Sequence, residues 1–431
     1  MNNTSLLDQI RVYSEALVED LPRPPISTAK LTESLVVQPL ERSRGLAIAV
    51  VAAALTVIIL GGVVWLAPLG GETPPANEPE TVIPSPTPTV VDPTVGAVGQ
   101  FSQTSEFSVW GMSDTPMGIL AIGDYRGGWA VFRSTDAVTW SVVEETYTLP
   151  DQAHVGVAGS NLGYVVAAGP IGGEDGGFWF SADGAEWAWV PVTWDQRRYD
   201  QVAMAVAASD FGFVVVGVES VRGRSIAWFS PDGLTWTQVL DADDDDDSTR
   251  QSNYLFDVDY SKEYGFVAVG ELGSVPAIWR SSDGLSWTMT RPDEQQREGV
   301  MFGVAASERG IVIGGGDGGD HAVWYSLDGN SWIRSVPLVE NEDGFHYPIV
   351  STVAASSRGF IAAGGTSASK SSIRRPVMWY STDGQTWTQV PPDDTVIIAD
   401  DRWAWMDTSV TLGSKFVASG GGVWTFTPPE S

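Results

Sequence analysis

The sequence contains no cysteine, which excludes disulfide bonds, zinc–thiolate sites and a cysteine nucleophile. Its three histidines, His154, His321 and His346, do not have metal-ligand spacing, and we expect all three in loops. Positive charge is also scarce, because 24 Lys and Arg stand against 54 Asp and Glu, a formal net charge of -30. Phosphate binding needs a cationic face, so the sequence predicts no nucleic-acid partner.

Glycine, proline and tryptophan are abundant, with 47, 26 and 19 residues respectively in a chain of 431. This composition favours short strands joined by tight turns over helices. The sequence therefore predicts an all-β fold stabilised by packing. Nothing in it indicates a cofactor.

Residues 45–67 are uncharged and apolar, and a helix of this length spans about 34 Å, enough for a hydrocarbon core of about 30 Å. Arg42 and Arg44 precede the segment, and the next basic residue is Arg126, so the positive-inside rule predicts a cytoplasmic N-terminus. A cleaved signal peptide is disfavoured because 44 residues precede an apolar stretch that is longer than usual. We expect one membrane helix with everything after it extracytoplasmic.

Two short segments flank this predicted helix. Residues 68–98 are rich in proline and threonine and form an extended linker in this interpretation. Residues 1–44 form a cytoplasmic segment whose apolar residues at helical spacing predict a short amphipathic helix, namely Leu6, Ile10, Tyr13 and Leu17. This segment is either interfacial or a dock for a cytoplasmic partner.

One hairpin recurs six times in residues 99–431. The copies are FRSTDAVTW, WFSADGAEW, WFSPDGLTW, WRSSDGLSW, WYSLDGNSW and WYSTDGQTW, with aspartates Asp136, Asp183, Asp232, Asp283, Asp328 and Asp383. They lie about 45 to 55 residues apart, which fits one four-stranded β-propeller blade each. An apolar strand that ends in glycine, such as GFVVVG at 212–217, precedes each hairpin and is predicted to be an inner strand.

The chemistry of the repeated turn accounts for its composition. Asp-Gly between two strands predicts a type I′ hairpin, in which both central residues have positive φ. The Asp carboxylate and the Ser hydroxyl are expected to accept hydrogen bonds from N–H groups of the turn. The first copy has Ala137 in place of glycine, so we expect its turn to be of another type.

A seventh unit is predicted at the C-terminus, with strands at 406–413, 415–421 and 423–426. It lacks a fourth strand, which residues 101–104 are expected to supply, so that both chain ends close the ring. We predict a seven-bladed propeller. Six blades, with residues 406–431 outside the ring, are the alternative.

The six hairpins resemble the Asp box, or BNR repeat, of sialidase-like β-propellers, in a form one residue shorter than usual. The resemblance covers about residues 101–427 and implies a propeller of a membrane-anchored bacterial type. In that family the box lies on the rim, away from the active site. It therefore implies the fold and a non-catalytic structural role for the six aspartates.

Sialidases of this family also require an arginine cluster and a tyrosine nucleophile backed by glutamate. The only Phe-Arg pair, at Phe132, lies inside a hairpin strand and does not match the family motif, so no catalytic residue is carried over. The nearest constellation is Arg197, Arg198 and Tyr199 in one predicted loop, which an ordinary polar connection also explains.

Two further groups of residues are candidates for binding. Asp243, Asp245 and Asp247 belong to an acidic run that offers oxygen ligands to Ca²⁺, although a solvated acidic loop is the favoured interpretation because the EF-hand spacing and its glycine are missing. Trp194, Trp403 and Trp405 lie in predicted loops, where they form either a binding platform or packing between blades.

Taken together, these patterns predict an extracytoplasmic binding or sensor module for a glycan, peptide or protein. A sialidase-like glycoside hydrolase is the alternative, and the sequence favours the binding module over an enzyme.

Overall fold

The computed structural model describes the propeller part of the chain. The described residues are 102–105, 109–125, 128–146, 155–168, 170–171, 176–192, 201–219, 223–242, 253–292, 297–317, 320–337, 347–367, 374–393, 406–420 and 422–429. Within these ranges no helix is long and apolar enough to cross a membrane. The predicted segments 1–44, 45–67 and 68–98 lie outside them.

The described residues form only strands and their connections. The strands are β1 (Ser102–Ser105), β2 (Val109–Thr115), β3 (Gly118–Tyr125), β4 (Gly128–Ser134), β5 (Ser141–Thr146), β6 (Val155–Ser160), β7 (Gly163–Ala168), β8 (Pro170–Ile171), β9 (Gly177–Ser181), β10 (Ala188–Pro191), β11 (Gln201–Ala208), β12 (Phe213–Glu219), β13 (Arg224–Ser230), β14 (Thr237–Ala242), β15 (Asn253–Ser261), β16 (Gly265–Leu272), β17 (Val275–Ser281), β18 (Thr288–Thr290), β19 (Gly299–Ser307), β20 (Gly310–Asp317), β21 (Asp320–Ser326), β22 (Ile333–Ser335), β23 (Tyr347–Ser356), β24 (Gly359–Ser367), β25 (Arg374–Ser381), β26 (Thr388–Val390), β27 (Met406–Leu412), β28 (Lys415–Gly420) and β29 (Val423–Phe426).

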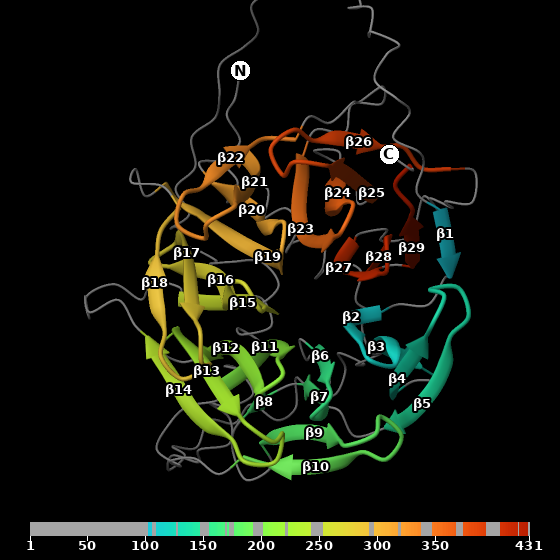
Figure 1. Ribbon diagram of the computed structural model, residues 1–431, viewed down its shortest axis with the longest axis vertical. Helices are drawn as coiled ribbons and strands as arrows, with labels where there is room; N and C mark the ends of the chain where they lie inside the picture. The colour runs from blue at the N-terminus through green and yellow to red at the C-terminus, as the bar shows by residue number, and fades with distance from the viewer. Residues whose placement is uncertain are drawn as a thin grey trace, which may run out of the picture.

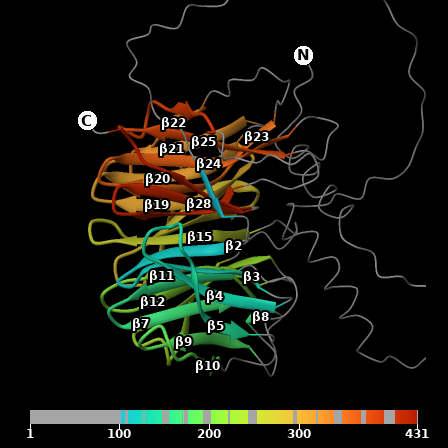
Figure 2. The same ribbon diagram turned by 90° about the vertical axis from the view of Figure 1, so that its right-hand side faces the viewer.

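These strands form seven antiparallel sheets arranged as blades around a central axis (Figure 1). In each blade strand A lies nearest the axis, strand B follows, strand C carries the repeated aromatic residue, and strand D lies outermost. In the third sheet the two-residue β8, from the connection between strands B and C of the second blade, also pairs with the free edge of β11. The A strands are β2, β6, β11, β15, β19, β23 and β27. Seen from the side, the ring is a thick disc whose strands run between its two faces (Figure 2). The glycine-ending strands are thus second from the axis.

The two ends of the described chain meet in the seventh blade. Strand β1 pairs antiparallel with β29 and supplies the outermost strand that the C-terminal unit lacks, with Gln103 opposite Trp424. The prediction of ring closure by the N-terminal segment is confirmed. The alternative of six blades is wrong, because β27, β28 and β29 form a blade of the ring.

The hydrophobic core lies between neighbouring blades. Strand B is buried on both faces, as in β12 and β20, where every residue is buried. The strand C tryptophans of five blades are almost fully buried, namely Trp228, Trp279, Trp324, Trp379 and Trp424. One cluster joins Tyr380 of the sixth blade to Phe416 and Phe426 of the seventh. Packing between blades therefore replaces a single central core.

The repeated turn, which we call the Ser-Asp turn, spans the residues from the serine to the closing tryptophan of each hairpin. In the third blade, Asp232 Oδ1 accepts hydrogen bonds from the N–H groups of Leu234 and Thr235 at 2.9 and 2.7 Å. Ser230 Oγ accepts one from Gly233 N–H at 2.8 Å. The predicted capping is confirmed.

The prediction of a type I′ turn is wrong. Strand pairing ends at Phe229 opposite Thr237, so a longer loop connects the strands than the two residues of a type I′ turn. Only Gly233 has positive φ, at 74°, and no box aspartate among the described residues does. The side-chain caps hold the loop, so positive φ is needed at one position only.

The first blade has the same turn as the others, contrary to prediction. Ala137 adopts a φ of 64°, close to that of Gly233, and Asp136 caps the N–H groups of Val138 and Thr139. These two hydrogen bonds lower the pKa of Asp136 to about 2. The caps outweigh the cost of about 1–2 kcal/mol for a left-handed residue with a Cβ.

The preceding blade decides whether a turn tolerates alanine. A Cβ at Gly233 would overlap the ring of Phe180, and one at Gly284 would overlap Phe229. The strand position equivalent to Tyr380 in the seventh blade carries the smaller Thr425. The turn of the first blade follows the seventh around the ring, which leaves room for the methyl group of Ala137.

We predict that Gly233→Ala lowers the free energy of unfolding by about 2 kcal/mol or more, because it combines overpacking against Phe180 with a left-handed backbone. Ala137→Gly should stay within about 1 kcal/mol of the wild type, since relief of the positive φ offsets the lost methyl burial. Urea unfolding measures both. Equal stability of Gly233→Ala and wild type would show that the blades do not fix this turn.

Candidate functional site

The two faces of the disc differ in their connections. On one face, the Ser-Asp face, lie the Ser-Asp turns and the connections between strands A and B. On the other, the loop face, strand D of one blade connects to strand A of the next, and strand B connects to strand C. The candidates Trp194, Arg197, Arg198, Tyr199, Trp403, Trp405, Asp243, Asp245 and Asp247 all belong to D-to-A connections and lie outside the described residues.

The innermost strands share a feature that the sequence reading missed. In six of the seven, the pairing with strand B shifts by one residue near the loop face, leaving one residue in a β-bulge. The bulge residues are Trp110, Met204, Phe256, Phe302, Ser351 and Asp407. They occupy equivalent positions, so together they form a rim around the axis at the loop face, which we call the bulge rim.

Glycines on strand B permit these bulges. A Cβ at Gly217 would overlap the carbonyl oxygen of Val202, and one at Gly270 would overlap that of Tyr254. Gly315 and Gly364 stand in the same relation to the innermost strands of their blades. The glycine that ends the repeated apolar strand is therefore the sequence signal for the bulge. Bulges are often found next to functional sites, so this rim is a candidate for binding.

Aromatic side chains dominate one part of the bulge rim. Phe256 and Phe302, from adjacent blades, are in edge contact with ring centroids 5.6 Å apart. Phe256 also stacks on Tyr254 at 5.5 Å. These rings are half-buried or buried and belong to the packing between the fourth and fifth blades.

Trp110 differs from the other aromatic residues of the rim because 49% of its surface is exposed. Its ring lies against Trp129 with centroids 6.3 Å apart and 34° between the planes. Asp124, at the end of β3, pairs across the strands with Trp129, which places its carboxylate beside the two tryptophans. Desolvation raises the pKa of Asp124 above its ordinary value, and its polar interaction with the Trp110 side chain opposes this shift. A large aromatic face beside a carboxylate is thus available at the loop face.

The innermost strands carry charge of one sign. Among the described residues of these seven strands there is no Lys or Arg, whereas four carboxylates are present: Asp114, Asp257, Asp259 and Asp407. A sialidase site needs arginines that converge on the substrate carboxylate. The described innermost strands do not provide them, which weighs against the hydrolase alternative.

Two of these carboxylates connect neighbouring blades. Asp257 Oδ2 accepts a hydrogen bond from Val304 N–H at 2.9 Å, and Asp259 Oδ2 accepts one from Ala306 N–H at 2.8 Å. Both donors lie on β19 of the next blade, at the inner edge of its sheet. Desolvation raises the pKa of Asp257 to about 7 and that of Asp259 to about 6. Their geometry assigns them to the seam between blades, as caps for strand-edge N–H groups.

Glu271 of the fourth blade occupies the strand position that Asp124 occupies in the first. It is buried opposite Tyr254, and desolvation raises its pKa to about 8. Burial, followed by the nearby Glu271, raises the pKa of Tyr254 as well. The same position therefore holds a buried acid in one blade and an exposed one in another.

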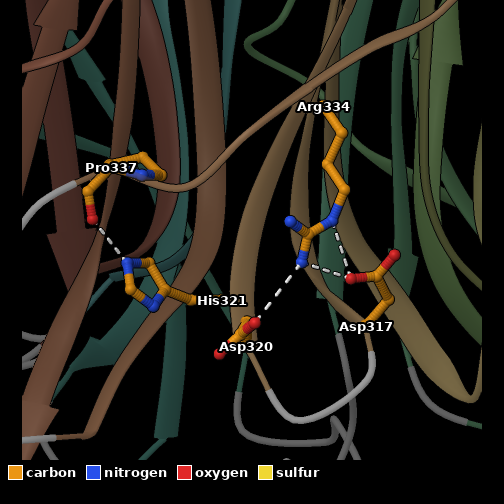
Figure 3. Close-up of polar contacts among 5 residues, drawn as sticks. All are labelled: Asp317, Asp320, His321, Arg334 and Pro337. Carbon is orange, nitrogen blue, oxygen red and sulfur yellow. Dashed lines mark hydrogen bonds and ion pairs between the residues drawn. The ribbon is translucent and has the colours of Figure 1, made fainter.

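A polar cluster at the loop face of the fifth blade is shown in Figure 3. The Arg334 guanidinium donates two hydrogen bonds to Asp317 Oδ1, one of them from Nε at 2.7 Å, and lies 4.0 Å from Asp320 Oδ2. His321 lies on β21, so its prediction as a loop residue is wrong. Its Nε2 is 2.6 Å from the carbonyl oxygen of Pro337, and its ring stacks on Trp379. Burial lowers the pKa of His321, which indicates a neutral structural imidazole.

No three His, Asp or Glu side chains within the described ranges form a group suited to hold a metal ion. His154 and His346 lie outside those ranges, as do the aspartates of the predicted Ca²⁺ site.

Comparison with known proteins adds the following. No family model matches the sequence, and no curated protein matches it. Among solved structures, YCF48 bound to D1 peptide is 14% identical, with a TM-score of 0.48 over 77% of this chain and 100% of that chain. Selenomethionine-substituted virginiamycin B lyase from Staphylococcus aureus is 7% identical, with a TM-score of 0.46 over 77% and 99%. Similarities this remote support no argument about ligand or activity.

Glu271 generates a prediction about pH. Because its pKa is raised from 4.5 to about 8, the folded protein keeps a proton that the unfolded chain has lost within this window. Stability from this group is therefore greatest below about pH 4.5 and is lost as the pH rises to about 8. We expect Glu271→Gln to flatten the decline in unfolding free energy between pH 5 and pH 8, by on the order of 1 kcal/mol per pH unit.

Urea unfolding across that range provides the measurement. Asp210→Asn is the control, because it also removes one negative charge, from an exposed ion pair with Lys262 on the Ser-Asp face. It should keep the slope of the wild type. Parallel curves for Glu271→Gln and wild type would contradict the assignment.

Proposed function

We propose that this chain is an interaction module that binds its ligand through the loop face of the propeller. The observation that carries the proposal is Trp110, a half-exposed indole at a bulge of an innermost strand, next to the carboxylate of Asp124. Tryptophan offers a large contact area at low entropic cost, and it is enriched among residues that dominate binding energy. The proposed ligand is a glycan, a peptide or a protein, as predicted from the sequence.

The proposed location of the module rests on the sequence. In this proposal residues 45–67 anchor the chain in the membrane, residues 1–44 are cytoplasmic, and residues 68–98 hold the propeller away from the bilayer. A cytoplasmic partner of residues 1–44 would then receive the signal of ligand binding outside.

The absence of Lys and Arg from the described innermost strands supports binding over sialidase-like hydrolysis. A sialic acid carries a carboxylate that needs convergent basic side chains, and the arginines of the predicted constellation, Arg197 and Arg198, belong to a D-to-A connection. We therefore retain the binding module as the proposed function.

The test uses the full chain in detergent micelles on glycan and peptide arrays. We expect the wild type to bind a defined subset of probes and Trp110→Ala to lose that binding. Trp189→Ala is the matched control, because Trp189 is 38% exposed and also contacts another tryptophan, but on outermost strand β10. It should bind as the wild type does. An unchanged binding pattern for Trp110→Ala would refute the assigned face.

A further inference from the structure

The charge and the aromatic content of the bulge rim select a chemical class of ligand. Trp110 presents an exposed indole, and the exposed carboxylate of Asp124 lies beside it, opposite Trp129 in the strand pairing. Neither the ring face of an indole nor a carboxylate attracts an anion. Both attract a cation, the indole through its ring face and the carboxylate through its charge.

The neighbouring blade adds to this preference. Asp407 occupies in β27 the bulge position that Trp110 occupies in β2, and it is exposed. Strands β27 and β2 lie next to each other at the axis (Figure 1). Asp124 and Asp407 are both exposed, and the described innermost strands contain no basic residue, so the field at this part of the rim is negative. A surface of one sign raises the local concentration of ligands of the opposite sign.

The ring geometry places the cation on one side of Trp110. The indole already contacts Trp129 at 6.3 Å between centroids, too close for a cationic group between the two rings. The exposed part of the indole is therefore the surface that remains for a ligand. Trp129 supports Trp110 from behind and holds its orientation.

We propose that the bulge rim binds a positively charged organic group, an ammonium or guanidinium, seated on the exposed face of Trp110 and paired with Asp124. The lysine and arginine side chains of a basic peptide are the source that we favour, because several cationic groups on one ligand add their attraction to a chain with a formal net charge of -30. This inference rests on the proposed function and specifies its ligand. It also accounts for an exposed tryptophan in a protein that buries most of its strand C tryptophans.

The experiment is isothermal titration calorimetry on the full chain in detergent micelles. The probes are tri-arginine amide, its neutral counterpart tri-citrulline amide, both N-acetylated so that the peptide ends carry no charge, and tetramethylammonium chloride. We expect tri-arginine amide to bind and tri-citrulline amide not to bind. Trp110→Ala should weaken tri-arginine binding by about threefold or more, in keeping with a cation–π contribution of about 0.5–1 kcal/mol at an exposed site.

Four variants separate binding at the site from attraction to the overall negative charge. Trp110→Ala leaves the charge unchanged, so non-specific attraction cannot account for a loss. Asp124→Asn should weaken binding further. Asp210→Asn, which removes a charge from the Ser-Asp face, should not weaken it more than slightly, and Trp189→Ala should behave as wild type.

Each outcome decides the proposal. Equal tri-arginine affinity of Trp110→Ala and wild type overturns it, as does equal weakening in Trp110→Ala and Trp189→Ala or equal binding of tri-citrulline. Trp110-dependent binding of tetramethylammonium supports the site and extends it to small quaternary amines, whereas binding of tri-arginine alone supports it and restricts it to peptides. Trp110-dependent binding of neutral probes on the arrays, without tri-arginine binding, overturns the cation and leaves the proposed function standing.

Discussion

The pairing of β1 with β29 is the interaction on which the rest of the structure depends. It joins two segments more than three hundred residues apart in the chain and completes the seventh blade. Without it, the backbone edge of β29 from Val423 to Thr425 would be open. Because the chain has no cysteine, noncovalent contacts alone hold the ring closed.

Once the ring is closed, two repeated devices act on opposite faces. On the Ser-Asp face, the capped turns fit against the strand C side chain of the preceding blade, as Gly233 does against Phe180. On the loop face, the strand B glycines let the innermost strands bulge, which sets the positions of residues such as Phe256. The first device stabilises the seams between blades. The second leaves side chains at the axis that differ from blade to blade, which is what a binding surface requires.

Much of the fold could be predicted from the sequence because each repeat consists of short patterns of neighbouring residues. The aspartate, serine and tryptophan of each hairpin gave the blade count, and the missing fourth strand after Phe426 indicated closure by the N-terminal segment. The turn type was mistaken because the Asp-Gly pair suits a two-residue hairpin, whereas the side-chain caps of Asp232 and Ser230 stabilise a longer loop. The prediction that Ala137 changes the turn type was wrong, because the room for its methyl group depends on Thr425 in another blade.

The candidate site was less accessible to sequence reasoning. Trp110 is one of 19 tryptophans, and its exposure follows from a bulge and from its place at the axis, neither of which is a local pattern. The glycine that ends strand B was visible as part of a strand, but its meaning lies in the carbonyl oxygen that approaches it from strand A. The aromatic and basic residues predicted from the sequence belong to D-to-A connections, and only their composition indicated a site there.

Amide hydrogen exchange shows directly whether the N-terminal segment closes the ring. Two fragments should be compared, one beginning at residue 99 and one at residue 107, which lacks β1. We expect the amides of β27, β28 and β29 to be protected in the longer fragment and to exchange much faster in the shorter one. The amides of the third and fourth blades should change little. Equal protection of β29 in the two fragments would contradict closure by the N-terminal segment.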